Sequence, residues 1–270
     1  MTILDSDRRS SNSLLPTLQS FNVSRRLLRD ALKSMAVIFV LSLVGSVALA
    51  YHYSLEPVVP FAAAGLLAVM FGLALCFLPQ HRHTRFGYAN LVTAVRAAAT
   101  SLVAATILLS DAFAGSDGTA LVWAVFVITV VALTLDGFDG YLARRFNHVS
   151  EFGAKFDMEV DAFLILMLSC AAFVLGKAGA WVLLIGAMRY MFILGQLALP
   201  ALNQPLEPSF RRKLVCVVQV LALGIVLVPV VEAPISAWIS AIALIALVYS
   251  FAVDIVALVR GSSKSVAARG

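Results

Sequence analysis

Four aspartates lie within a short stretch of this chain, and their spacing follows the helical turn. From Leu135 to Ala162 the chain reads LDGFDGYLARRFNHVSEFGAKFDMEVDA. In a helix, one face would present Asp136, Asp139, Gly140, Ala143 and Arg144, which recur at i, i+3, i+4, i+7 and i+8. A second helical stripe would hold Gly153, Asp157 and Asp161, four residues apart. The connection is short enough for an antiparallel helix pair, so we expect the four carboxylates to converge.

Such a carboxylate cluster needs compensating positive charge. Like charges at close range in a poorly hydrated site either take up protons or bind cations. Hard oxygen ligands suit Mg²⁺ or Mn²⁺, and two such ions about 4 Å apart are a standard arrangement for phosphoryl chemistry. Gly140, Ala143 and Gly153 leave room for a substrate against the helix backbone, and the planar guanidinium of Arg144 can bind a diphosphate. The pattern therefore predicts two-metal phosphoryl transfer.

Acidic residues in an apolar chain have another interpretation. Intramembrane carboxylates also pair with arginine or line an ion pathway, as in transporters. That interpretation suits an isolated charge such as Asp254, but it does not account for residue types matched on two helical stripes. A divalent-cation transporter is retained as the less favoured alternative.

The elements that must position these residues are membrane helices. Hydrophobic residues make up 61% of the 270 residues, charged residues 13%, and the mean hydropathy is +0.95. A soluble core cannot hide that much apolar surface, so the composition predicts an integral membrane protein in a lipid bilayer. The net charge of +5 does not indicate a nucleic-acid partner, because no basic face with interleaved aromatic residues is present.

Eight apolar segments are long enough to cross a bilayer. They span residues 34–51, 58–78, 90–110, 119–135, 155–176, 179–198, 214–230 and 234–258. Lys and Arg gather in alternate loops, and only Lys177 breaks the alternation. By the positive-inside rule, both termini and the loop after Asp136 face the cytoplasm. We therefore expect a multi-pass protein whose active site faces the cytoplasm. If the source is bacterial, the membrane is the cytoplasmic membrane.

Residues 1–33 form a segment of a different kind. Leu28, Leu32 and Met35 repeat at helical spacing, while basic residues such as Arg25 and Lys33 occupy other faces. This pattern favours an amphipathic helix on the anionic cytoplasmic surface, with a frayed tail as the alternative. No cleavage site typical of a signal peptide follows the first apolar segment, so we expect that segment to be retained.

The acidic stretch as a whole resembles the signature of the CDP-alcohol phosphatidyltransferase family, D-x2-D-G-x2-A-R-x8-G-x3-D-x3-D, at every position. Eight specified residues match by chance with a probability on the order of 10⁻¹⁰ per starting position. The resemblance implies an all-α membrane fold with a six-helix catalytic core over residues 86–260. Outside that core, the apolar segments predict two additional transmembrane helices within residues 34–80, and residues 261–270 form a cytoplasmic tail. The resemblance also implies a homodimer as one form of assembly.

The resemblance also implies roles for individual residues. Asp136, Asp139 and Asp157 would hold two divalent cations, and Asp161 would bind metal and act as general base. Gly140, Ala143, Arg144 and Gly153 would shape the pocket for the CDP moiety. Upstream, Asn90, Thr93 and Arg96 match an N-x2-T-x2-R pattern in which Asn and Thr help bind the nucleotide. The same repeat is also typical of a helix N-terminus with Asn90 as its cap.

The implied substrates are CDP-diacylglycerol and a small polar alcohol. Arg189, Arg211, Arg212 and Lys213 could together hold a phosphate on that alcohol, whereas the last three also suit topological anchoring. The family's glycerophosphate enzymes often have G-K-x-K-T-x2-Q here, and this chain has RKLVCVVQ, which keeps only Lys213 and Gln219. A soluble CDP-choline or CDP-ethanolamine donor with diacylglycerol as acceptor is the second alternative.

Overall fold

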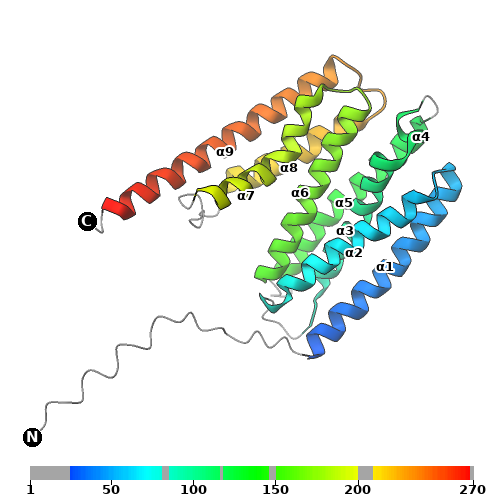
Figure 1. Ribbon diagram of the computed structural model, residues 1–270, viewed down its shortest axis with the longest axis horizontal. Coiled ribbons are helices and arrows are strands. Elements are labelled where there is room, and N and C mark those ends of the chain that lie inside the picture. Colours follow the sequence, from blue (N-terminus) through cyan, green and yellow to red (C-terminus); the bar gives the residue numbers. More distant parts are fainter. Residues whose placement is uncertain (1–24, 81–84, 116–117, 146–149, 200–208, 268–270) are drawn as a thin grey trace, which may run out of the picture.

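The computed structural model describes residues 25–80, 85–115, 118–145, 150–199 and 209–267, and in these ranges it is helical without strands (Figure 1). The long helices are α1 (Arg25–Tyr53), α2 (Val58–Phe77), α3 (Tyr88–Leu109), α5 (Thr119–Arg145), α6 (Glu151–Val174), α7 (Leu183–Ala198), α8 (Phe210–Leu227) and α9 (Ile235–Ala267). The short ones are η1 (Leu78–Gln80), α4 (Asp111–Ala114) and η2 (Ala180–Val182). The predicted all-α fold is confirmed, and each predicted apolar segment corresponds to a long helix.

Six helical segments in the described ranges are long and apolar enough to cross a membrane. They lie in α1, α2, α3, α5, α9 and the combined η2–α7 segment, with mean hydropathies between 1.5 and 2.4. The other two long helices each carry three charged residues in their apolar stretch. These are Asp157, Glu159 and Asp161 on α6, and Arg211, Arg212 and Lys213 in the first turn of α8. The structure therefore supports a multi-pass membrane protein, and the eight-span topology stays a prediction.

Helix α3 lies at the centre of the bundle. It packs against α1, α2, α5 and α6, and its apolar segment is the most buried of the six. In Figure 1, α1 and α2 lie along one side of the molecule, whereas α7, α8 and α9 lie along the other. Small residues permit this close packing, since Ala94, Ala97, Ala104 and Ala105 on α3 are all fully covered. The residues that α3 presents can therefore reach both α5 and α6.

The basic residues near the start of the described chain belong to α1 itself. This helix begins at Arg25 and runs without a break into the first apolar segment. Leu27, Ala31 and Met35 are buried against neighbouring helices, whereas Leu28 and Leu32 are exposed. Residues 25–33 are thus the first turns of a packed helix, continuous with the segment predicted to start at residue 34. Their placement on a membrane surface stays a prediction.

Lys177, which breaks the charge alternation, has a structural role. It lies between α6 and η2, and its Nζ donates to the carbonyl oxygens of Pro229 and Val231 at 3.1 and 2.6 Å. In return, Ser236 Oγ donates to the carbonyl oxygen of Lys177 at 2.5 Å. The ammonium group thus satisfies backbone acceptors of the α8–α9 connection. These hydrogen bonds explain a lysine here without any topological signal.

Candidate active site

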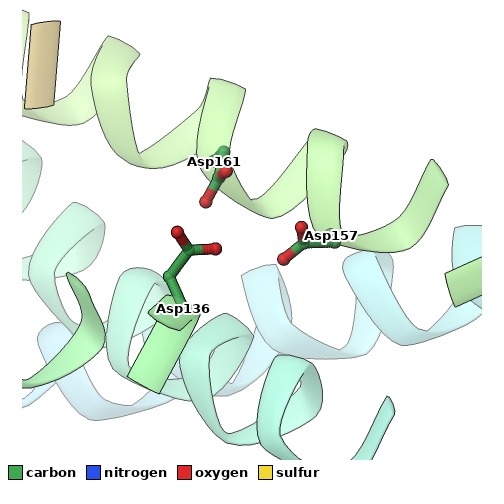
Figure 2. Close-up of side chains that lie close together, drawn as sticks. All are labelled: Asp136, Asp157 and Asp161. Carbon is green, nitrogen blue, oxygen red and sulfur yellow. The ribbon is translucent and has the colours of Figure 1, made fainter. Parts of the chain in front are cut away.

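Three of the four motif aspartates meet at one end of the bundle, which we call the motif end. Asp136 lies near the end of α5, and Asp157 and Asp161 lie one turn apart near the start of α6. Each offers a carboxylate oxygen, and these oxygens lie within 4.8 Å of one another. Figure 2 shows the carboxylate of Asp136 directed across the gap toward the two on α6. The predicted convergence of the two acidic stripes is present for these three residues.

The two acidic helices meet mainly through α3. It packs along both α5 and α6, whereas in the described part of the chain α5 and α6 themselves make at most marginal backbone contact. The two predicted helices are therefore both packed on a third helix, α3. This spacing leaves room for charged side chains between α5 and α6, and the three carboxylates keep partial exposure of 22 to 37%.

Arg96 of α3 forms the other half of this charge cluster. Its Nη1 pairs with Asp136 at 2.9 Å and also with Asp157, and its Nη2 pairs with Asp161. The side chain is completely buried, and its guanidinium supplies donors in a fixed planar fork that suits several carboxylates at once. One positive charge against three negative charges leaves a formal net charge of −2 (1 − 3) for these four residues.

The N-x2-T-x2-R pattern contains Arg96, but the pattern by itself predicts no role for this residue. The available signal was an arginine in the middle of an apolar helix, where an unpaired charge is costly and calls for a named partner. The sequence shows that Arg96 is an unusual residue for an apolar helix. Only the packing of α3 against both α5 and α6 identifies its partners.

Asn90 and Thr93 lie on the same helix as Arg96, nearer its start. The interpretation of Asn90 as a helix cap is wrong, because α3 begins at Tyr88 with Gly87 in the capping position. Both side chains are buried; Asn90 Nδ2 donates to the carbonyl oxygen of Phe86, and Thr93 Oγ1 donates to that of Ala89 at 3.1 Å. Asn90 therefore projects its amide toward α6 instead of ending a helix.

Gly153 lies opposite Asn90 across the α3–α6 contact. A methyl group added at Gly153 would lie 2.6 Å from Asn90 Oδ1 and 3.1 Å from Ser150 Oγ. Ser150 caps α6, since its Oγ accepts the backbone N–H of Gly153 at 3.0 Å. The glycine of the motif is thus required by the close approach of a buried amide, an effect that residue spacing does not predict.

We expect Gly153→Ala to disturb the start of α3 and α6 because the new methyl group must displace Asn90. Overpacking of this kind typically costs about 1–3 kcal/mol. The expected result is a lower thermal unfolding temperature, measured by calorimetry on purified protein. Gly65→Ala on α2, where no neighbouring atom lies within 4 Å of the added methyl, is the matched control and should not lower the unfolding temperature, because alanine favours the helix. An unfolding temperature of Gly153→Ala that is no lower than that of the parent protein would contradict the expectation.

The remaining motif residues lie on the last turns of α5. That helix continues to Arg145, so Asp139, Gly140, Ala143 and Arg144 have the helical backbone that their spacing predicts. Their side chains lie outside the described part of the structure.

Comparison with known proteins decides the family. The family model for CDP-alcohol phosphatidyltransferase matches residues 86–252, which is more than half of the chain. The chain belongs to the CDP-alcohol phosphatidyltransferase family. No curated protein and no solved structure matches the chain in the corresponding searches. The predicted family is therefore confirmed, and with it a transferase class that belongs to phospholipid biosynthesis in membranes.

The chemistry of the described cluster fits a divalent cation, which members of the family generally use. Carboxylate oxygens are the hard ligands that Mg²⁺ and Mn²⁺ prefer. Asp136, Asp157 and Asp161 place three such oxygens close enough to share an ion, and their partial exposure gives an ion access from water. The set lacks His and Cys, which agrees with a hard cation instead of zinc.

Three of the four cations predicted to hold an acceptor phosphate have acidic partners within the fold. Arg189 on α7 pairs with Glu159 on α6. Arg211 and Arg212 on α8 both pair with Asp254 on α9, at 2.5 and 3.3 Å. Lys213 is exposed. Asp254, which stood as an isolated intramembrane charge in the sequence, thus has two arginine partners.

The family's glutamine position also has a structural role in this chain. Gln219 is buried, and its Nε2 donates to the carbonyl oxygen of Ala243 at 2.7 Å. Arg211 makes a further contact of this kind, because Nη1 donates to Ser250 Oγ at 2.8 Å. Polar groups at these positions therefore hold α8 against α9. Both predicted roles of the basic residues at the start of α8, acceptor binding and topological anchoring, stay predictions.

Proposed function

We propose that this protein transfers a phosphatidyl group from CDP-diacylglycerol to the hydroxyl of a small polar alcohol, with release of CMP. The observation that supports this most directly is the meeting of Asp136, Asp157 and Asp161 at the motif end, in a chain that belongs to the family. An integral membrane bundle with a partly exposed acidic site suits a reaction between a lipid donor and a polar acceptor.

Asp136, Asp139, Asp157 and Asp161 would hold two divalent cations, Mg²⁺ or Mn²⁺. When bound, these ions would offset the negative charge of the donor pyrophosphate and of the departing CMP. The close placement of the three described carboxylates supports this assignment.

Asp161 would also orient and deprotonate the acceptor alcohol. The hydroxyl proton passes to its carboxylate, the oxygen forms a bond to the phosphorus that bears the lipid, and the bond from that phosphorus to the CMP oxygen breaks. CMP leaves with the electron pair of that bond. Asp161 pairs with Arg96 and lies beside Asp136 and Asp157, so its position relative to the acceptor hydroxyl supports this role.

The nucleotide would lie against the start of α3 and the small residues of α5 and α6. Asn90 and Thr93 come from α3, Gly153 from α6, and Gly140, Ala143 and Arg144 from the last turns of α5. The contact between Asn90 and Gly153 supports a common pocket, because it joins residues from two of these helices. Arg144 would bind the diphosphate through its planar donors.

Arg189, Arg211, Arg212 and Lys213 would serve an acceptor that carries a phosphate. Arg211 and Arg212 would then exchange Asp254 for the phosphate, and Arg189 would exchange Glu159. With an uncharged or zwitterionic alcohol, these ion pairs would remain as they are. The preferred acceptor therefore decides whether these residues bind a phosphate or only form ion pairs between helices.

We further propose that all eight long helices cross the membrane, with both termini and the motif end on the cytoplasmic side. The alternation of basic loops supports this topology, and the structural role of Lys177 removes the exception to it. Helices α6 and α8 can cross despite their charges because those charges lie in the first half of each helix, and Asp157, Asp161, Arg211 and Arg212 are paired within the bundle.

The test is release of CMP by the purified full-length protein in lipid nanodiscs with Mg²⁺ or Mn²⁺. CDP-diacylglycerol is supplied with a panel of alcohols with and without phosphate, and the lipid products are identified by mass spectrometry. We expect CMP release that depends on the metal and one dominant product. Activity only with CDP-choline or CDP-ethanolamine and diacylglycerol would replace the proposed donor. Metal flux into liposomes without nucleotide turnover would instead indicate a transporter.

A further inference from the structure

The first two helices lie outside the family-matched segment, yet they pack directly on the motif end. Leu27, Ala31 and Met35 of α1 belong to one buried apolar cluster with residues of α3 and α6. On α6 the members of this cluster are Phe152, Phe156 and Val160, and Phe86, just before α3, also belongs to it. Helices α1 and α2 pack on α3 from the side of the bundle along which they lie in Figure 1.

Aromatic residues in this cluster alternate with the site residues of α6. Phe152 precedes Gly153, and Phe156 precedes Asp157. The Phe152 ring lies 6.1 Å from that of Phe86 and 6.0 Å from that of Phe156, measured between centroids. Because the phenylalanines fill the space toward α1 and α3, they fix the rotation of α6 that directs Gly153 and Asp157 to the site.

One hydrogen bond ties α1 to the start of α3. Asp30 Oδ2 accepts the backbone N–H of Phe86 at 2.9 Å, although the two residues are 56 positions apart. Phe86 is followed by Gly87, which adopts a φ of +83° and makes no side-chain cap for α3. The carbonyl oxygen of Phe86 accepts from Asn90 Nδ2. Asp30 therefore holds the turn on which the side chain of Asn90 depends.

A matched bond exists at the other end of α3. Glu56, between α1 and α2, accepts the backbone N–H of Asp111 through Oε1 at 3.0 Å. Backbone N–H groups of Glu56 itself and of Asp111 lower the pKa of this carboxyl from its ordinary value, against the opposing effect of desolvation. The α1–α2 pair thus holds α3 by a carboxylate at each end, and only the Asp30 bond lies at the motif end.

We infer that Asp30 is a positioning residue for the nucleotide site, acting through the Phe86–Asn90 turn. The inference rests on the proposed function for the identity of the ligand, since it takes CMP as the nucleotide that Asn90 helps to bind. Asp30 touches neither the nucleotide nor the reacting atoms in this role. It supplies an acceptor to one backbone amide, and that amide orients the start of α3.

The test compares Asp30→Ala with Glu56→Ala in the full-length protein in nanodiscs. Titration calorimetry measures CMP binding in the presence of Mn²⁺, and hydrogen exchange measures the backbone of residues 86–96 and 110–114. We expect Asp30→Ala to weaken CMP binding about 5- to 10-fold, the size of one lost hydrogen bond, and to speed exchange at 86–96. Glu56→Ala should speed exchange at 110–114 and leave CMP affinity within about twofold.

A conservative variant separates position from charge. Asp30→Asn keeps an acceptor oxygen without the negative charge, so CMP affinity should return to within about twofold of the parent protein. If Asp30→Ala cannot be purified folded, Asp30→Glu moves the acceptor by one methylene and must show the same weakening. Unchanged CMP affinity in Asp30→Ala, or in Asp30→Glu if that variant takes its place, would overturn the inference. An equal loss of CMP affinity in Glu56→Ala would also overturn it. If the parent protein binds no CMP, the proposed function fails, and exchange at 86–96 still tests the positioning role.

Discussion

Asp157→Asn and Asp161→Asn are each expected to abolish metal-dependent release of CMP. Both substitutions keep the size of the side chain while removing a charged oxygen from the described cluster. We expect the turnover rate to fall about 10²- to 10⁴-fold, because the proposed function makes Asp157 a metal ligand and Asp161 a ligand that also takes the acceptor proton. The measurement is CMP release against Mg²⁺ concentration, with binding of Mn²⁺ followed by electron paramagnetic resonance.

The matched control for these variants is Glu159→Gln. Glu159 lies on α6 between the two aspartates, but it pairs with Arg189 of α7 on another face of the helix. The Glu159→Gln variant should bind Mn²⁺ with the affinity of the parent protein, and its activity should depend on Mg²⁺ concentration in the same way. Wild-type rates and Mn²⁺ affinity in both aspartate variants would refute the assignment of the metal ligands.

Replacing Arg96 is expected to have the second largest effect, and it should affect folding as well as activity. Arg96→Met removes the guanidinium and leaves three carboxylates facing one another within 4.8 Å. Loss of one partner of a buried ion pair typically costs about 3–5 kcal/mol, and partial exposure of the carboxylates places the expected loss near the lower value. Thermal unfolding in EDTA, followed by tryptophan fluorescence, should show the loss.

Divalent cations should stabilise Arg96→Met more than they stabilise the parent protein. In the variant, no guanidinium shares the three carboxylates with a bound ion. Binding of the ion therefore raises the free energy of unfolding more than it does in the parent protein. Arg189→Met is the control, because its ion pair with Glu159 is partly exposed and should contribute less than about 1 kcal/mol. A variant Arg96→Met that is as stable as the parent protein in EDTA would show that the guanidinium is not needed to balance the cluster.

The helices could be predicted because their signals are local. Long apolar segments require internal backbone hydrogen bonding in lipid, so hydropathy alone predicts helices there. The acidic stripes could be predicted for a similar reason, since residues at i, i+3 and i+4 must share a face once the segment is helical. In Figure 2, Asp157 and Asp161 accordingly lie on the side of α6 that faces Asp136.

The contacts between helices could not be predicted in this way. A short connection between α5 and α6 indicates neighbours, but it says nothing of the third helix that lies against both. These contacts depend on how each helix is rotated about its own axis. Examples are the ion pairs of Arg96, the approach of Asn90 to Gly153 and the pairing of Asp254 with Arg211. That rotation is set by the packing of side chains from the whole bundle.

The sequence by itself therefore determined the family, the all-α membrane class and the four aspartates that could serve phosphoryl transfer. Only the tertiary structure decided that a buried arginine from α3 balances three of those aspartates, and that α1 holds the start of α3 through Asp30. The physical reason is the range of the interactions. Helical periodicity acts over a few residues, whereas the charges of this site are matched between helices that are far apart along the chain.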